Sequence, residues 1–266
     1  MDYPEYKTII LEFHGKVARI FLNRPDVHNA FNNELIDDLF DAFTNLNKEE
    51  DVRSIVLTGK GKSFCAGADL NWMKSVIENT FRENFEESLK LAQLMHLIFT
   101  HTKPVIARIN GAAVGGGVGL MSVCDILIAS EQAKFGLSEV KLGLVPAAIS
   151  PFVMSRIGEA NARELFITGE RITAEYARKI GLVNQVVTYD KLDETVDRKL
   201  DLILQNGPEA VRVVKKMIYD VTQKNFPELL EYTADIIANL RISKEGQEGM
   251  NAFLEKRLPS WRTGEN

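Results

Sequence analysis

The chain contains little cysteine, and its few histidines are not spaced as metal ligands. Only two of its 266 residues are cysteines, Cys65 and Cys124, and no CxxC pair occurs. Two cysteines cannot build a disulfide framework, so a reducing compartment such as the cytoplasm is expected. The four histidines show no HxxxH spacing, and the gap between His96 and His101 turns them onto different helix faces. We therefore expect no metal site.

Long apolar runs and an excess of basic residues are also missing. No run of about 18 apolar residues occurs, so no membrane span is expected. The opening residues, MDYPEY, lack the basic and apolar blocks of a secretory signal peptide. A formal net charge of −5 without a basic stripe argues against nucleic-acid binding. The 266 residues, 45% of them hydrophobic, suffice for one large domain or a domain with a small appendage.

Strands and helices alternate in the first half of the chain. Residues 8–13 and 17–22 are rich in β-branched and apolar side chains and predict a hairpin around His14-Gly15-Lys16. Further buried strands are predicted over 52–58, 103–109 and 125–129, and helices over 29–47 and 85–100. This alternation implies right-handed crossovers and a largely parallel sheet, which is an α/β fold.

After about residue 150 strands almost vanish and the pattern becomes helical. Helices are predicted over 160–168, 173–180, 189–205, 208–222, 227–241 and 244–257. Several of them are amphipathic, so their apolar faces must pack against the core or a neighbouring subunit. We therefore predict a sheet-bearing core over residues 1–200 and a C-terminal helical region over residues 201–266.

Two segments consist mainly of residues with almost no side chain. They are Phe64-Cys65-Ala66-Gly67-Ala68-Asp69-Leu70 and 109–120, which contains Gly115-Gly116-Gly117. Such segments let a ligand approach the main chain, and two N–H groups directed at one point form an oxyanion hole. Residues 115–120 also predict a helix start, whose dipole adds to the same field. Taken alone, the glycine run equally fits a tight strand-to-helix turn with close packing.

Several short motifs follow one another in a specific order and spacing. They are Asn23-Arg24-Pro25 with Asn29-Ala30, Cys65 to Leu70, Lys103 to Ala107, Asn110-Gly111, Gly115-Gly116-Gly117, Cys124-Asp125-Ile126, Lys134-Phe135-Gly136, Glu139, Leu142 to Pro146, Gly181-Leu182-Val183 and Phe253 to Arg257. Together they resemble the crotonase (enoyl-CoA hydratase/isomerase) superfamily over essentially the whole chain. The resemblance implies a spiral of ββα units whose C-terminal helical region serves trimerisation. It also implies an acyl-CoA thioester substrate, with coenzyme A as part of the substrate and no separate cofactor, and a homotrimer or hexamer.

The resemblance further assigns roles to individual positions. It implies that the N–H groups of Ala68 and Gly116 form the oxyanion hole and that Glu139 is the acid–base carboxylate. Glu139 precedes a Val/Leu-rich turn, and apolar surroundings raise the pKa of a carboxyl toward the range of a general base. In the resemblance, Phe253 and Lys256 close over the nucleotide from an adjacent subunit. The substrate-binding positions it implies are His28, Ala30, Ala66, Asp69, Leu70, Val114, Gly115, Gly119, Phe253 and Lys256, of which the first five line the CoA channel.

Gly119 departs from the family's pattern. Well-studied hydratases of the family carry a second glutamate at this position, which pairs with the first. Three hypotheses follow. Glu139 serves both proton transfers, or another acid such as Glu78 or Glu83 moves in, or the reaction needs one base only, as in double-bond isomerisation.

The segments 68–73 and 138–151 most resemble bacterial methylglutaconyl-CoA hydratase-like members of leucine degradation. For such a dicarboxylic acyl chain, Lys141, Arg108 and Arg156 are candidates to hold the distal carboxylate, although a surface salt bridge is the commoner role. The prediction is therefore an enoyl-CoA hydratase with a branched substrate. Its rivals are an enoyl-CoA isomerase and a non-catalytic CoA- or RNA-binding protein of the same fold. The acyl chain, the direction of flux and the choice between trimer and hexamer stay open.

Overall fold

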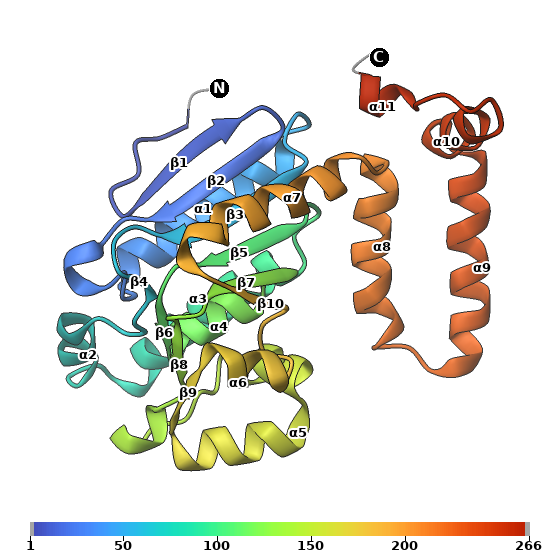
Figure 1. The fold of residues 1–266 in the computed structure, drawn as a ribbon. Helices are drawn as coiled ribbons and strands as arrows, with labels where there is room; N and C mark the ends of the chain where they lie inside the picture. Colours follow the sequence, from blue (N-terminus) through green and yellow to red (C-terminus); the bar gives the residue numbers. More distant parts are fainter. Residues whose placement is uncertain (1–2, 264–266) are drawn as a thin grey trace.

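A computed structural model describes residues 3–263 and contains two β-sheets (Figure 1). One sheet has the order β1-β2-β3-β5-β7-β10 and the other the order β4-β6-β8-β9. Three successive strand pairs, β3 with β4, β5 with β6, and β7 with β8, each send one strand to each sheet, which confirms the predicted ββα spiral. The strands are β1 (Ile9–His14), β2 (Val17–Leu22), β3 (Ser54–Gly59), β4 (Ser63–Cys65), β5 (Val105–Ile109), β6 (Ala112–Val114), β7 (Ile126–Ser130), β8 (Lys134–Gly136), β9 (Arg171–Thr173) and β10 (Gln185–Val187).

The central strands of the six-stranded sheet, β3, β5 and β7, are buried on both faces. The β1–β2 hairpin of this sheet is antiparallel and every other pair is parallel, as the alternating pattern predicts. Val56, Ile106 and Ile128 point to one face, where they pack against Leu192 and Val196 of α7 (Leu192–Leu204). The opposite face packs against α1 (Asn33–Lys48) and α3 (Phe81–Phe99). Burial on both faces explains why these strands read as continuous apolar runs.

Some helix boundaries differ from the predicted ones for local reasons. The first helix begins at Asn33 rather than at residue 29, because Asn29 has a φ of +57° and the Asn32 side chain caps the helix. Helix α5 (Ser150–Thr168) begins ten residues earlier than predicted and breaks its regular geometry at Gly158. The short strands β9 and β10 were not predicted, since three residues carry too little periodicity. The remaining helices of the core are α2 (Leu70–Val76), α4 (Gly116–Ser122), α6 (Ala174–Lys179), η1 (Pro25–Val27), η2 (Glu139–Leu142) and η3 (Tyr189–Lys191).

The last four helices stand apart from the two sheets (Figure 1). They are α8 (Pro208–Val221), α9 (Phe226–Ile242), α10 (Lys244–Leu254) and α11 (Ser260–Thr263). Helix α8 is tied to the core by Lys215, whose Nζ lies 2.7 Å from a carboxylate oxygen of Asp125. The predicted boundary between residues 200 and 201 falls inside α7. No helix within residues 3–263 is long and apolar enough to cross a membrane.

Candidate active site

The two small-residue segments lie side by side. Gly67 has a φ of +91° and Gly115 a φ of +50°, and these are backbone conformations that residues other than glycine rarely adopt. A Cβ atom added at Gly67 would lie 2.9 Å from the carbonyl oxygen of Val114 and 3.9 Å from the nitrogen of Gly116. The close approach therefore requires glycine, and it brings the main chain around Ala68 next to the start of α4.

The N–H groups of Ala68 and Gly116 are available to a ligand. Phe31 donates its N–H to Gly67 O (2.6 Å) and accepts from Asp69 N (2.9 Å). These two hydrogen bonds lie on either side of Ala68 and leave its N–H without an acceptor among the described residues. Gly116 is the first residue of α4, and the first N–H groups of a helix have no intrahelical acceptor. Among residues 3–263 neither N–H donates to another group. Two unengaged donors on adjacent segments are the elements from which an oxyanion hole is made.

The Glu139 carboxylate lies against the same turn. Helix η2 begins at Glu139, three residues after β8, and a Cβ atom at Gly115 would lie 2.8 Å from Glu139 Oε1. Burial raises the pKa of Glu139, as the apolar sequence context predicts. A hydrogen bond from its own backbone N–H offsets only part of this rise. Its Oε2 is buried and has no hydrogen-bond partner in the described part of the chain. Glu139 is therefore a half-buried carboxylate with one oxygen free to exchange a proton.

No second carboxylate stands at position 119. Gly119 is buried within α4, and the side chain next to it is Ile149. Of the two acids considered as replacements, Glu83 accepts the backbone N–H and the hydroxyl of Thr80, each at 2.7 Å, in the capping box of α3. Those bonds lower the pKa of Glu83. Glu78 is exposed in the turn between α2 and α3.

Asp69 has a structural role beside the candidate oxyanion hole. The side chain is 5% exposed and lies 2.8 Å from an Arg24 guanidinium nitrogen. It also caps α2 by accepting the N–H of Asn71 at 2.7 Å. Burial alone would raise the pKa of Asp69, but the hydrogen bonds from Arg24 and the cap hold it below its usual range. These contacts fix the backbone directly after Ala68.

The other predicted CoA-channel residues lie around the same segment. His28, exposed and left-handed with a φ of 53°, has its Nδ1 3.0 Å from Ser63 Oγ. Ala66 is half-buried and donates its N–H to His28 O at 3.0 Å. Ala30 is buried and its carbonyl accepts from Arg24, whereas Leu70 is 74% exposed. Residues 28–30 and 66–70 therefore form one continuous region next to Ala68.

Phe253 and Lys256 are not part of this region in the single chain. Phe253 lies near the end of α10 and is 82% exposed, and Lys256 follows α10 with a φ of +57°. Helix α10 and α2 lie at opposite sides of the molecule (Figure 1). Any contribution of these two residues to the site has to come from another copy of the chain.

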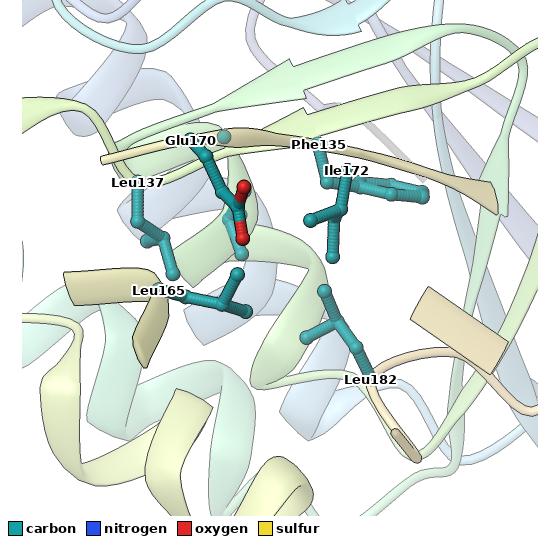
Figure 2. A pocket seen from close by; sticks show the side chains of 8 residues that line it. Phe135, Leu137, Leu165, Glu170, Ile172 and Leu182 are labelled. Atoms are coloured by element: carbon teal, nitrogen blue, oxygen red, sulfur yellow. The ribbon is translucent and has the colours of Figure 1, made fainter. Parts of the chain in front are cut away.

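Two hollows border these elements, and Ala68, Gly116 and Glu139 line neither of them. One is a cavity of about 10 Å³. Its lining includes Glu170, Leu137, Leu165 and Leu182, which Figure 2 shows from close by. Such a volume holds no more than about one water molecule, so it is too small for an acyl group. An open hollow of about 470 Å³ lies beside Asp69 and Trp72, at the start of α2.

The three candidates for a distal carboxylate differ in their engagement. Arg108 donates two hydrogen bonds to Asp193, at 2.7 and 2.9 Å. Arg156 donates to main-chain carbonyls, among them Ser122 O at 2.8 Å. Lys141 lies in η2 with Glu139, is exposed, and makes no ion pair with another of residues 3–263. Ser138 stands at the N-cap position of η2 but makes no side-chain capping bond.

Sequence reasoning missed three residues of this region. Phe31 bridges the Gly67–Asp69 segment, and its ring lies 3.3 Å from where a Cβ atom at Gly116 would be. Arg24 was noted only as part of a motif, without its role as the partner of Asp69. Ile149 adjoins Gly119 from 30 positions away. No local pattern indicates these contacts, since each joins elements that are separate in sequence.

Comparisons with known proteins give a consistent result. The family model "Enoyl-CoA hydratase/isomerase" matches residues 12–264. A crotonyl-CoA hydratase from Syntrophomonas wolfei is 37% identical over 254 residues, which cover 95% of this chain and 96% of that protein. An enoyl-CoA hydratase structure from Shewanella pealeana has a TM-score of 0.93 at 38% identity, covering 97% of each chain. A putative enoyl-CoA hydratase/isomerase (crotonase) from Legionella pneumophila has a TM-score of 0.90 at 45% identity, covering 96% and 98%.

Proposed function

Because the chain belongs to the enoyl-CoA hydratase/isomerase family, we propose that it adds water across the 2,3 double bond of an enoyl-CoA thioester. The observation that carries the proposal is the Glu139 carboxylate beside Gly115, with Oε2 unpartnered, next to the unengaged N–H groups of Ala68 and Gly116. A proton-transfer group and an anion-stabilising pair at one turn are what an enolate reaction needs.

The proposed chemistry proceeds through an enolate. The thioester oxygen accepts hydrogen bonds from Ala68 and Gly116 while water adds to C3. Negative charge moves onto that oxygen, where two N–H donors stabilise it more than they stabilise the ground state. Removal of one such donor typically costs about 3–4 kcal/mol of transition-state stabilisation. The N-terminal dipole of α4, which begins at Gly116, adds to the same field.

The proposed CoA channel runs along residues 28–30 and 66–70, with Val114 and Gly115 at the thioester. Phe253 and Lys256 of a neighbouring copy would close over the nucleotide, in a homotrimer or hexamer. The exposure of both residues and the position of α10 across the molecule from α2 support this assignment. A cytoplasmic location is part of the same proposal and rests on the resemblance.

The activity is tested by incubation with crotonyl-CoA and with methylglutaconyl-CoA. Loss of the enoyl-thioester absorbance with either one supports hydration. No loss with either, together with conversion of a 3-enoyl-CoA, would replace the hydratase by an isomerase. The isomerase is the second candidate because Gly119 leaves one carboxylate, and one carboxylate suffices to move a proton between two carbons.

Glu139→Gln separates an enzyme from a binding protein of the same fold. It keeps the shape of the side chain and removes the base, so activity falls by about 100-fold or more. Unchanged activity in this variant would favour the non-catalytic rival, which binds CoA or RNA.

A branched, methylglutaconyl-like acyl chain is proposed on the resemblance of segments 68–73 and 138–151. Among the candidate cations, Lys141 is supported by its exposure and by its place in η2 with Glu139. Lys141→Met is expected to raise the KM for methylglutaconyl-CoA at least about tenfold, the loss of one charge-assisted hydrogen bond. The KM for crotonyl-CoA, which has no distal carboxylate, serves as the control and stays unchanged.

A further inference from the structure

The space beside Gly119 is filled by one apolar side chain. Gly119 lies three residues after Gly116 in α4, so both glycines share one helix face. A Cβ atom added at Gly119 would lie 2.6 Å from Ile149 Cβ, and closer still to Ile149 Cγ2. Real Cβ atoms do not approach other carbons this closely. Position 119 therefore lacks the space for any side chain in this packing.

Ile149 cannot yield by rotating its side chain. It is 3% exposed and stands at the N-cap position of α5, where its carbonyl accepts the N–H of Val153 at 3.1 Å. The overlap involves its Cβ atom, which moves only if the backbone moves. That backbone belongs to a helix packed against α4, so relief would require a shift of α5 relative to α4.

The opposite side of the turn is arranged differently. At Gly115, a Cβ atom would meet the carboxylate end of Glu139, a flexible polar group. At Gly119, one turn further along α4, an added Cβ atom would meet the Cβ branch point of the buried Ile149. The glycine run therefore has the Glu139 carboxylate beside its first residue and the buried apolar side chain of Ile149 beside Gly119.

We propose that Ile149 fills the space from which a carboxylate at position 119 would act, so that the acid–base chemistry of this turn falls to Glu139. The inference rests on the proposed function for its chemistry but not for its packing. In hydration, Glu139 accepts one water proton as the oxygen bonds to C3, and the C2–C3 π electrons move into the enolate. Glu139 then returns that proton to C2, which regenerates the carboxylate and balances the addition of one water.

The packing is tested by a double-mutant cycle read by thermal unfolding, which needs no substrate. G119E is expected to lower the melting temperature by about 4 °C or more through overpacking. I149G removes both clashing atoms, and glycine is tolerated at an N-cap, so the G119E/I149G protein melts above G119E. Ile157, a buried isoleucine further along α5, supplies the control, and I157G should not rescue G119E. If G119E yields no folded protein, G119A introduces the Cβ alone and replaces it.

The packing claim is overturned if G119E melts like the wild type or if I149G fails to raise its melting temperature. The chemical claim is tested with E139Q, by following hydration and the exchange of the C2 proton in D₂O. A single carboxylate predicts that both fall by about 100-fold or more. Retention of C2 exchange would show that another acid, such as Glu78, reaches the substrate, and would overturn it. If the wild type acts on no enoyl-CoA, the proposed function fails while the melting cycle still decides the role of Ile149.

Discussion

At the scale of single residues, the burial that suits Glu139 to its proposed role also costs stability. Burial without a partner for Oε2 raises the pKa of this carboxyl, and an ionised buried group without partners destabilises the fold. Since its folded pKa lies above the unfolded one, its contribution is most favourable at low pH. That contribution is lost as the pH rises through the folded value. The same burial makes the group a better proton acceptor.

We predict that the acid limb of kcat/KM lies above the ordinary glutamate pKa of about 4.3, because the base must be ionised and burial opposes ionisation. The measurement is a pH–rate profile with crotonyl-CoA. E139Q removes the buried charge, so at pH 7 it should melt at or above the wild-type temperature while activity is lost. A marked drop in its melting temperature would instead indicate a structural role for Glu139.

His101 is a second buried titratable residue, and its role is structural. It is 1% exposed, accepts the Lys103 N–H at Nδ1 (3.1 Å) and places Nε2 3.2 Å from Phe43 O. Burial, together with the charges of Lys215 and Lys103, lowers the pKa of His101 to about 4. The ring is therefore neutral in the fold at pH values where the unfolded chain, with a histidine pKa of about 6.5, binds a proton.

This difference predicts that stability falls as the pH drops from about 6.5 toward 4, because the unfolded state binds more protons over that window. The free energy of unfolding, measured in urea at a series of pH values, should show the slope. His101→Gln retains polar contacts but cannot titrate, and it should flatten the slope. His96→Gln, at an exposed position in the last turn of α3, is the control and should leave the slope unchanged.

At the scale of elements, the site is held by the ends of helices and strands. Helix α4 begins at Gly116, α2 begins directly after Asp69, and η2 begins at Glu139. Each end leaves main-chain N–H groups without intrahelical acceptors, and the chain uses Asp69 to satisfy those of α2. The N–H of Gly116 stays unengaged, which is the difference between a capped helix end and one that can bind an anion.

Asp69 is predicted to stabilise this arrangement through both of its contacts. Asp69→Ala removes the α2 cap and leaves Arg24 without its buried partner, at a cost of about 3–5 kcal/mol of unfolding free energy. Asp69→Asn retains an acceptor for the cap and should cost less. Urea unfolding measures both, and Asp26→Ala, at an exposed position, is the control. A loss below about 1 kcal/mol for Asp69→Ala would contradict the role of the ion pair.

At the scale of the whole molecule, the apolar side chains of α8 and α9 are not covered by the rest of the described chain. No residue of α8 or α9 is buried within the described chain. On α9, Phe226 and Ile242 are 75% and 78% exposed, and Leu230 is 63% exposed. Apolar patches of this kind mark interfaces. The sequence leaves open whether such helices cover the core or a neighbour, and the structure shows that they stand away from the sheets (Figure 1).

We predict that α9 mediates assembly with other copies of the chain. Multi-angle light scattering should give a mass of three or six chains, and Leu230→Glu should shift it toward the monomer by placing a charge in the apolar contact. Gln132→Glu, an exposed change on the core, should leave the mass unaltered. A monomeric wild type would exclude both the assembly and the proposed contribution of Phe253 and Lys256.

Local features of the sequence predicted most of the fold and part of the site. The β1–β2 hairpin, the buried parallel strands and the start of α4 were predictable because periodicity and small residues act within a few positions. The short strands β4, β6, β8, β9 and β10 were not predicted, since each is three residues long and depends on its neighbours for pairing. The raised pKa of Glu139 followed from its apolar neighbours in sequence, whereas the contact with Gly115 did not.

The order of its motifs indicated the family, and the resemblance implied the spiral of ββα units. The sequence by itself determined the glycine turn, because a residue without a side chain permits a close approach wherever it lies. Only the tertiary structure decided what approaches. It paired Arg24 with Asp69 across 45 positions, set Phe31 beside Gly116, and placed Ile149 against Gly119. Those contacts depend on how α4 packs on α5 and how η1 meets α2, which is fixed by the whole core at once. An absent side chain is visible in the sequence, but the atom that fills its space belongs to another part of the chain.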